Sequence, residues 1–477
     1  MLYFTVATLL LVLGYFVYGT FTEKVFGASS ERRTPAVKYN DGLDFVPLPV
    51  WKIFLIQFLN IAGLGPVFGA ILGAIYGPVC LLWIVFGSIL AGGVHDYMTG
   101  MFSVRFKGCT MDYLVGKVLN KHFASLFMIF LVIILILVGA VFALNPAKML
   151  SGITGVNYFI CAVVIFGYYF LATLLPIDKI IGRFYPLFAM LLIGVTAALL
   201  VCLFKLDHAW FAEPVLTNLH PAKQPIFPLM FITVACGAVS GFHSTQSPIM
   251  ARCISNEKQG RKVFYGAMIL EGFIALVWAT LGIAFYQNQE LLMEVATKGG
   301  QGAVVSQIAH SFLGSLGGKL AVLSVIILAI TSGDTAFRSA RLTIASFLKI
   351  NQQDLKKRMI LSVLVLGSGI AFTLVDITTL WMYFAWANQT LATITLWAVS
   401  VYLKRHNRFY PITLLPAMFM TAVVSTYILF VKIGFNLPLQ YAKIGGIIIS
   451  LALAVMFFCF AKRKNITVVK EKEEISV

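Results

Sequence analysis

Long apolar stretches recur along the chain, and the short connectors between them carry most of the charged residues. A helix of about 20 apolar residues spans the hydrocarbon core of a bilayer with its backbone groups bonded internally. The pattern therefore predicts an all-α polytopic membrane protein with about thirteen transmembrane helices. A weaker run at residues 301–316 predicts a short outer helix. The predicted spans are residues 2–20, 50–75, 78–98, 123–145, 157–175, 184–205, 228–250, 262–286, 318–335, 358–375, 379–403, 409–431 and 440–462.

Composition supports this class and excludes others. Of the 477 residues 60% are hydrophobic and 12% are charged, whereas a soluble domain carries about 25% charged residues. No connector exceeds about thirty residues, which is too short for a soluble ATPase or kinase domain. We therefore expect a protein that is not an enzyme, with no catalytic residues. The seven cysteines show no paired spacing, so we expect neither a metal site nor another cofactor.

The net charge of +17 follows membrane topology and does not indicate a nucleic-acid partner. If residues 21–52 are cytoplasmic, all but seven of the 36 Lys and Arg residues fall on the cytoplasmic side of the predicted spans. This bias predicts an outer N-terminus and a cytoplasmic C-terminus in a multi-pass protein of the cell membrane. The seven exceptions are Lys148, Lys205, Lys223, Lys298, Lys319, Lys432 and Lys443.

The second predicted span is interrupted near its middle. It contains Gly63, Gly65 and Pro66 within the stretch IAGLGPVFG. Proline removes a helical hydrogen bond and clashes with the preceding turn, and glycine lets the backbone leave the helix. We expect a broken helix whose freed backbone groups face a cavity or buried protein.

The seventh predicted span carries a similar interruption. Its sequence includes Ser240, Gly241, His243 and Ser244, and Pro248 follows. The hydroxyl groups can bond freed backbone groups, and His243 can bind a carboxylate or relay protons near neutral pH. The alternative for His243 is a neutral side chain that only satisfies the broken backbone.

The two interruptions lie five spans apart, so the units that contain them are inverted in the membrane. This pattern is typical of transporters built from an inverted repeat around a central site. The alternative is a pair of tightly packed glycine-rich helices with a proline kink. The predicted organisation is an extra helix at 1–20, repeat units at 50–205 and 228–403, two C-terminal helices at 409–462 and a cytoplasmic tail at 463–477.

Five stretches resemble the carbon starvation protein A (CstA) family. The resemblance implies a secondary transporter of the amino acid–polyamine–organocation superfamily with a LeuT-like fold of five plus five helices, of which helices 2 and 7 are broken. It also implies ion-coupled import of peptides during carbon starvation, with pyruvate or another small carboxylate as the alternative substrate. The stretch after His243 is shorter than the family usually has. The matching stretches are Ile61–Gly69, Leu90–Asp96, Ala235–His243, Tyr265–Glu271 and Asp334–Arg341.

Ionisable residues inside predicted spans are candidates for ion coupling, because a charge in the bilayer costs about 2–3 kcal/mol on insertion scales. Glu271 lies within the eighth span and either couples protons or bonds a neighbouring helix in protonated form. Asp96, Asp334 and Arg338 fall near predicted cytoplasmic ends. They form either a gate of ion pairs or ordinary solvated helix ends.

The coupling ion is expected to be H⁺ or Na⁺. Hydroxyls of Thr331 and Ser332, together with carbonyls near Gly63, are the candidate ligands for sodium under the resemblance. A polar stretch from Tyr383 to Thr390 either packs between helices or lines the path. From another class of function, a passive channel is the alternative. The expected partners are a small-molecule substrate and the lipid bilayer.

Overall fold

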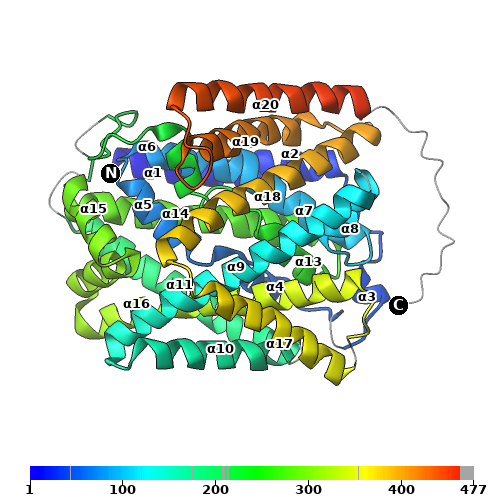
Figure 1. Cartoon of the computed structure of the whole chain (residues 1–477), viewed down its shortest axis with the longest axis horizontal. Helices are drawn as coiled ribbons and strands as arrows, with labels where there is room; N and C mark the ends of the chain where they lie inside the picture. The colour runs from blue at the N-terminus through cyan, green and yellow to red at the C-terminus, as the bar shows by residue number, and fades with distance from the viewer. Residues whose placement is uncertain are drawn as a thin grey trace.

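The structure is a computed structural model that describes residues 1–42, 45–119, 121–174, 177–206, 210–211, 214–352 and 354–461. Every regular element in these ranges is helical, and most helices run roughly along the long axis of the molecule (Figure 1). Within the described residues, eight helices are long and apolar enough to cross a membrane, or ten if each of two bent pairs forms one span. This confirms the all-α membrane class. The predicted tail, residues 463–477, lies outside the described residues.

The N-terminal half begins with a 25-residue apolar rod, Leu2–Phe26. Gly27 ends the rod in the left-handed conformation, with φ of 71°, as helix C-termini commonly do. The elements up to residue 204 are α1 (Leu2–Phe16), α2 (Tyr18–Phe26), α3 (Pro35–Lys38), α4 (Val50–Ala62), η1 (Gly65–Gly69), α5 (Ala70–Ala74), α6 (Val79–Gly87), η2 (Ser88–Gly92), α7 (Gly93–Arg105), α8 (Met111–Val118), α9 (Lys121–Thr154), α10 (Tyr158–Leu174) and α11 (Ile177–Phe204).

Side-chain caps set where several helices of the C-terminal half begin. Asn288, Asp354 and Asp376 each accept a backbone N–H of the helix that follows, which satisfies donors that lack a partner within the helix. The elements are η3 (Ile226–Met230), α12 (Phe231–Thr233), α13 (His243–Ala251), η4 (Glu257–Gln259), η5 (Arg261–Tyr265), α14 (Gly266–Tyr286), α15 (Gln289–Lys298), α16 (Gln301–Phe347), α17 (Leu355–Phe372), α18 (Ile377–Arg405), α19 (Pro411–Phe430) and α20 (Leu439–Phe460).

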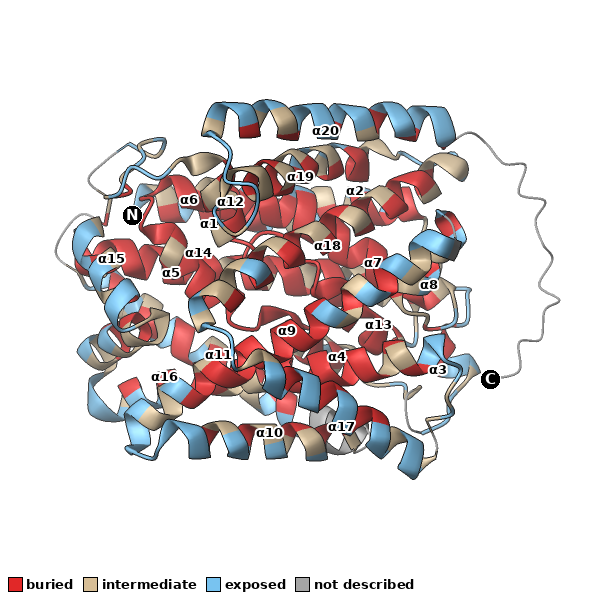
Figure 2. Ribbon diagram, in the orientation of Figure 1, coloured by how far each residue is buried: buried red, intermediate tan, exposed pale blue. Residues whose placement is uncertain are grey.

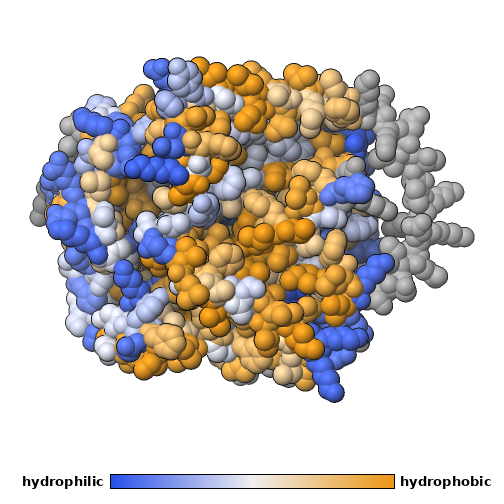
Figure 3. Space-filling view, viewed as in Figure 1, coloured by the Kyte–Doolittle hydropathy of each residue, from blue (hydrophilic) through white to orange (hydrophobic). Residues whose placement is uncertain are grey.

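The surface separates into an apolar band and two polar ends. The helices at the periphery, including α10, α17 and α20, turn their exposed faces outward, while the interior is buried (Figure 2). In the view of Figure 3, apolar residues cover the middle of the molecule and polar residues gather at both ends of the long axis. A band of this kind matches the hydrocarbon layer of a bilayer, so the long axis runs across the membrane.

The ninth predicted span, residues 318–335, ends too early. In the structure α16 has a kink at Gly314, where φ is 67° and ψ is −169°, and then continues to Phe347. The residues before the kink form a helical arm, at the position of the helix predicted for 301–316. The prolonged helix matters for the site, because it carries Asp334 and Arg338 inside the protein instead of to a helix end. Both side chains are buried.

Candidate functional site

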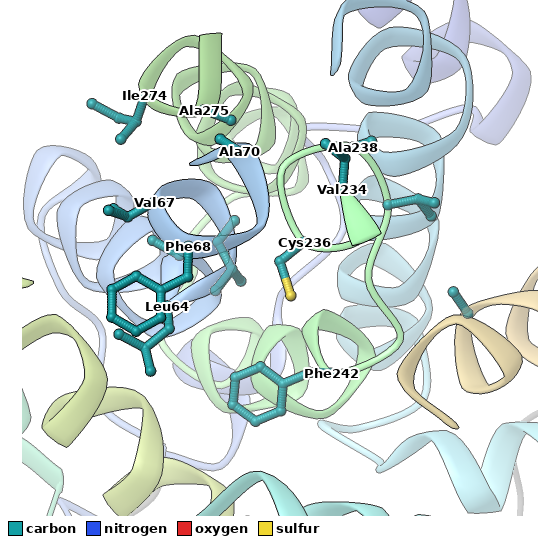
Figure 4. Packing of buried hydrophobic residues seen from close by; sticks show 14 of the residues in the cluster. Leu64, Val67, Phe68, Ala70, Val234, Cys236, Ala238, Phe242, Ile274 and Ala275 are labelled. Atoms are coloured by element: carbon teal, nitrogen blue, oxygen red, sulfur yellow. The ribbon is translucent and has the colours of Figure 1, made fainter. Parts of the chain in front are cut away.

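The two interrupted spans cross each other at their breaks. A Cβ atom at Gly65 would lie only 1.9 Å from the Cβ of Cys236, and one at Gly69 would lie 2.9 Å from the carbonyl oxygen of Thr233. Such an approach requires glycine. Figure 4 shows Cys236 facing the turn that carries Leu64 and Val67. The predicted interruptions are therefore real, and they meet inside the protein.

The break of the second span is short and sharp. Helix α4 ends at Ala62, Gly63 adopts φ of 48° and ψ of −152°, and the next helical turn, η1, starts at Gly65. The two parts of the span are bent by 56°. Pro66 has no N–H to continue the ladder. As predicted, Gly63, Gly65 and Pro66 together make the interruption.

The break of the seventh span is longer, because residues 234–242 leave the helix between α12 and α13. Side chains of neighbouring helices form hydrogen bonds with the backbone groups that lose their helical partners in this break. Trp83 Nε1 donates to the carbonyl of Val234 at 3.2 Å. Ser88 Oγ lies 3.0 Å from the carbonyl oxygen of Gly237 and 2.6 Å from that of Ile84, so its one hydrogen is shared between them. Buried backbone groups need such partners in a membrane protein. Neither Trp83 nor Ser88 stood out in the sequence.

Asn388 of α18 is the main support of this unwound segment. Its Oδ1 accepts the backbone N–H of Phe242 at 2.7 Å, and its carbonyl accepts that of Gly241 at 3.1 Å. Its Nδ2 donates to Ser240 Oγ at 3.0 Å. Gly241 must be glycine here, because a Cβ would lie 2.3 Å from the Asn388 carbonyl oxygen. Ser244 Oγ donates to the carbonyl of Gly241 at 2.6 Å. Ser240, Gly241 and Ser244 thus shape the segment.

Replacing Asn388 by Ala should destabilise the protein, because it leaves the buried N–H of Phe242 without an acceptor. An unsatisfied buried group of this kind costs about 1–3 kcal/mol. The measurement is thermal unfolding in detergent. Asn145→Ala is the matched control, since among the described residues Asn145 donates to the carbonyl of Val141 in its own helix and holds no broken segment. Equal melting temperatures for the two variants would show that Asn388 does not hold the segment.

Four buried ionisable side chains line up beside this segment, on α7, α13 and α14. Asp96 lies between two histidines: its Oδ1 is 2.8 Å from His95 Nδ1, and its Oδ2 is 2.8 Å from His243 Nδ1. On the other side of the His243 ring, Nε2 is 3.4 Å from Glu271 Oε2. All four side chains are fully buried.

The donor and acceptor roles of these four side chains limit where protons can lie among them. An ionised Asp96 can only accept, so it takes the Nδ1–H of His243. His243 Nε2 then meets Glu271 either as a neutral nitrogen facing a protonated carboxyl or as N–H facing a carboxylate. Both arrangements place one proton between the two groups, whose contact at 3.4 Å is an ion-pair contact and not a hydrogen bond in this structure. Loss of that proton leaves two acceptors facing each other, which repel.

Asp96 was predicted near the cytoplasmic end of its span, as a gate residue or a solvated helix end. The solvated-end interpretation is wrong, because α7 continues to Arg105 and Asp96 is fully buried. Asp96 instead meets His243, the first residue of α13. A helix N-terminus favours a nearby negative charge. The protein thus supplies its own carboxylate to His243, which was expected from the sequence to bind one.

Asp334 forms a second buried cluster, between α16, α10 and α11. Its Oδ2 accepts hydroxyl hydrogens from Tyr185 at 2.5 Å and Tyr168 at 3.0 Å. Tyr185 is also 3.3 Å from the carbonyl of Thr331. Arg338 donates to the carbonyl of Ala172 in α10. Solvated ends were one interpretation of Asp334 and Arg338, and the burial of both contradicts it.

Ser332, a candidate sodium ligand from the sequence, links α16 to the broken second span. Its Oγ is 3.3 Å from the carbonyl oxygens of both Leu59 and Asn60, and it is 3.5 Å from where a Cβ of Gly63 would lie. Thr331 Oγ1 instead bonds Leu328 within its own helix.

Two buried amides next to the breaks complete the site. Asn60 lies just before the first break, and Gln389 follows Asn388 beside the second. Among the described residues, neither amide has a hydrogen-bond partner for its nitrogen or its oxygen. Buried polar groups are normally paired, so these amides are candidates to bind a ligand. Asn60 did not stand out in the sequence. Its position three residues before Gly63 was the signal that could have identified it.

These features define a class: a polytopic helical membrane protein whose two interrupted spans meet around buried ionisable and polar side chains. The chain belongs to the carbon starvation protein CstA family, whose family model matches residues 1–163, 147–311 and 297–427. The resemblance inferred from sequence motifs is confirmed.

Relatives of the chain occur in bacteria, and two of the three described here carry transporter names. A Haemophilus influenzae membrane protein is 42% identical over 63% of this chain and 95% of its own length. The Escherichia coli peptide transporter CstA is 25% identical over 87% of this chain and 78% of its own length. The E. coli pyruvate/proton symporter BtsT is 29% identical over 54% of this chain and 45% of its own length.

Solved structures with the same fold include a manganese transporter of Eremococcus coleocola. The likeness has a TM-score of 0.57 at 12% identity, over 88% of this chain and 98% of that one. At this identity the likeness concerns the fold alone.

Proposed function

We propose that this protein is a proton-coupled symporter that imports small peptides. The observation that carries the proposal is the position of His243 between two buried carboxylates, at the start of the half-helix that follows the long break. Chains of Asp, Glu and His inside a membrane mark proton relays in transporters, so ionisable residues there are functional candidates.

The proton in this proposal acts as a link between helices. While it is present, Glu271 holds α14 to His243 of α13, and Asp96 holds α7 to the same ring. When it leaves, the facing acceptors of Glu271 and His243 repel, and α14 separates from α13. Proton release on one side of the membrane therefore favours a different packing of the broken span for the return of the empty carrier, whereas the substrate-loaded carrier reorients with the proton in place.

Small peptides are the substrate that we propose. A peptide offers backbone N–H and C=O groups, which match the unpaired amides of Asn60 and Gln389. The relatives named peptide transporters agree with this choice. Pyruvate or another small carboxylate is the second candidate, because a further relative is named a pyruvate/proton symporter.

Sodium is the second candidate for the coupling ion. Ser332 Oγ lies 3.3 Å from the carbonyl oxygens of both Leu59 and Asn60, and oxygens of this kind are ligands for sodium at unwound helices. Asp334 and Arg338 tie α16 to α10 and α11. In this proposal the two residues act as the gate of the substrate path, and the gate consists of hydrogen bonds buried inside the protein.

The proposed topology keeps the finer features inferred from sequence. It has about thirteen spans, with inverted units at 50–205 and 228–403, an outer N-terminus and a cytoplasmic C-terminus in the plasma membrane. The contact between the two breaks, at Gly65 and Cys236, supports a shared central site.

Uptake into liposomes tests the function. Purified protein should accumulate a labelled dipeptide when the lumen is alkaline and the outside acidic, and a sodium gradient alone should give no accumulation. Labelled pyruvate is the parallel substrate, and accumulation of pyruvate alone would select the second candidate. Accumulation driven only by a sodium gradient would indicate that the coupling ion is sodium, bound near Ser332. Unsaturable flux without accumulation would replace the symporter by a passive channel.

A further inference from the structure

An apolar groove opens on the outside of the protein, away from the ionisable site. It has a volume of about 460 Å³ and lies between α6, η2, η3, α12 and α19, with Tyr18 at one end. Its walls reach the surface, because Phe86, Leu90 and Leu415 are 47%, 40% and 66% exposed. We propose that this groove binds one acyl chain of an anionic phospholipid, whose headgroup lies against the basic segment Lys404–Arg408.

The length of the groove fits an acyl chain of one leaflet. Along α19 from Pro411 to Phe419, which both line it, a rise of 1.5 Å per residue gives about 12 Å. Half of a hydrocarbon core about 30 Å thick is about 15 Å. The groove therefore extends over most of the depth of one leaflet from the end that holds Pro411, and its lining is apolar apart from the phenol of Tyr18 and the indole nitrogen of Trp83.

The direction of the groove follows from its ring contacts. Phe419 of α19 packs on Trp83 with ring centroids 5.5 Å apart. Pro411, the first residue of α19, lines the same groove toward the end that holds Tyr18. There, Phe21 bridges Tyr18 and Phe409, with centroids 5.9 Å and 5.6 Å apart. Aromatic clusters of this kind mark the level of the lipid headgroups.

Positive charge gathers at this end of the groove. The segment KRHNR, residues 404–408, directly precedes Phe409 and Pro411, and residues 377–461 contain no Asp or Glu. Glu23 of the nearby α2 is engaged by Lys258 at 3.4 Å and Arg261 at 3.3 Å. Basic residues beside a span attract anionic headgroups. Charge complementarity therefore selects an anionic lipid over a zwitterionic one.

The groove also touches the moving part of the proposed transporter. Met230 and Phe231 line it and directly precede the unwound residues 234–242, and Trp83 donates to the carbonyl of Val234 from its inner wall. The deep end of a bound acyl chain thus packs against the helical residues that precede the break of the seventh span. Lipid binding can be measured without a proton gradient and without substrate.

Native mass spectrometry of the delipidated, detergent-solubilised full chain tests the inference, with phosphatidylglycerol and phosphatidylcholine of identical acyl chains as probes. We expect one tightly retained phosphatidylglycerol per chain. Arg408→Gln should reduce the preference for phosphatidylglycerol about fivefold, the effect of one basic residue at the membrane surface. Leu90→Trp should fill the groove and remove retention of both lipids.

Matched variants control for charge and for bulk on the lipid-facing surface. Lys356→Gln removes an exposed charge at the start of α17, and Leu187→Trp enlarges a 58% exposed residue on α11. Both should bind lipid as the wild type does, and size-exclusion profiles verify folding of all four variants. Equal retention by Leu90→Trp and Leu187→Trp, equal binding of the two lipids, or a lipid-free dimer that Leu90→Trp dissociates would each overturn the proposal.

Discussion

Replacing Glu271 by Gln is expected to abolish proton-driven accumulation of substrate while substrate exchange continues. A glutamine amide donates a hydrogen bond to His243 Nε2 as a protonated carboxyl does, but it cannot release the proton. The variant therefore keeps α14 bonded to α13 in every step. A gradient of one pH unit is worth about 1.4 kcal/mol per proton, which is a tenfold concentration ratio. With the membrane potential clamped to zero, the wild type should approach about tenfold accumulation of a dipeptide, and the variant about onefold.

Counterflow of labelled dipeptide, without any gradient, separates lost coupling from lost transport. The Glu271→Gln variant should keep counterflow at a rate close to that of the wild type. Glu290→Gln is the matched control, because Glu290 is an exposed residue in the first turn of α15. Tenfold accumulation by the Glu271→Gln variant would remove this carboxylate from the coupling reaction, and loss of counterflow would assign it a structural role.

The helical class and the two interruptions could be predicted because their causes are local. Apolar length decides whether a segment spans the bilayer, and proline or glycine breaks a helix wherever it stands. Helical segments occur at all the predicted spans, although only eight to ten of the described helices or bent pairs meet the length and apolarity of a span. The sequence pattern could not set where α16 ends. The polar residues near residue 338 suggested that the helix ends there. In the structure the helix continues, and Arg338 is buried against α10, where it donates to the carbonyl of Ala172.

The composition of the ionisable site was only partly predictable. His243 and Glu271 stood out because each is a lone ionisable residue in an apolar span. Asp96 was assigned to a helix end, since nothing local links it to His243, 147 residues away. The partners of Asp334 were missed for the same reason. Tyr168 and Tyr185 precede it by 166 and 149 residues, and in the sequence they resemble ordinary aromatic residues of a span. Contacts between side chains of different helices depend on how each helix is rotated about its axis and how deep it lies in the membrane. Neither quantity can be read from the local sequence of one chain.

Gly65→Ala is the substitution with the largest expected effect on folding. The new Cβ would lie 1.9 Å from Cys236 Cβ and 2.6 Å from its Sγ, so the two breaks must separate. Overpacking of this kind costs on the order of 3 kcal/mol, and the melting temperature in detergent should fall accordingly. Cys236→Gly in the same chain removes both clashing atoms and leaves the Cα of residue 236 at 3.2 Å. The double variant should therefore melt above Gly65→Ala and recover counterflow.

This rescue distinguishes direct contact between the breaks from two independent defects. Independent sites give additive changes in stability, whereas residues in contact show a coupling energy of about 0.5–3 kcal/mol. Gly194→Ala is the control, since a Cβ there meets nothing within 4 Å, and it should leave the melting temperature unchanged. If Gly65→Ala and Cys236→Gly were additive, the crossing of the two breaks would be wrong. The central site would then lose its scaffold, because the crossing is what holds the half-helix that begins at His243 beside the broken second span.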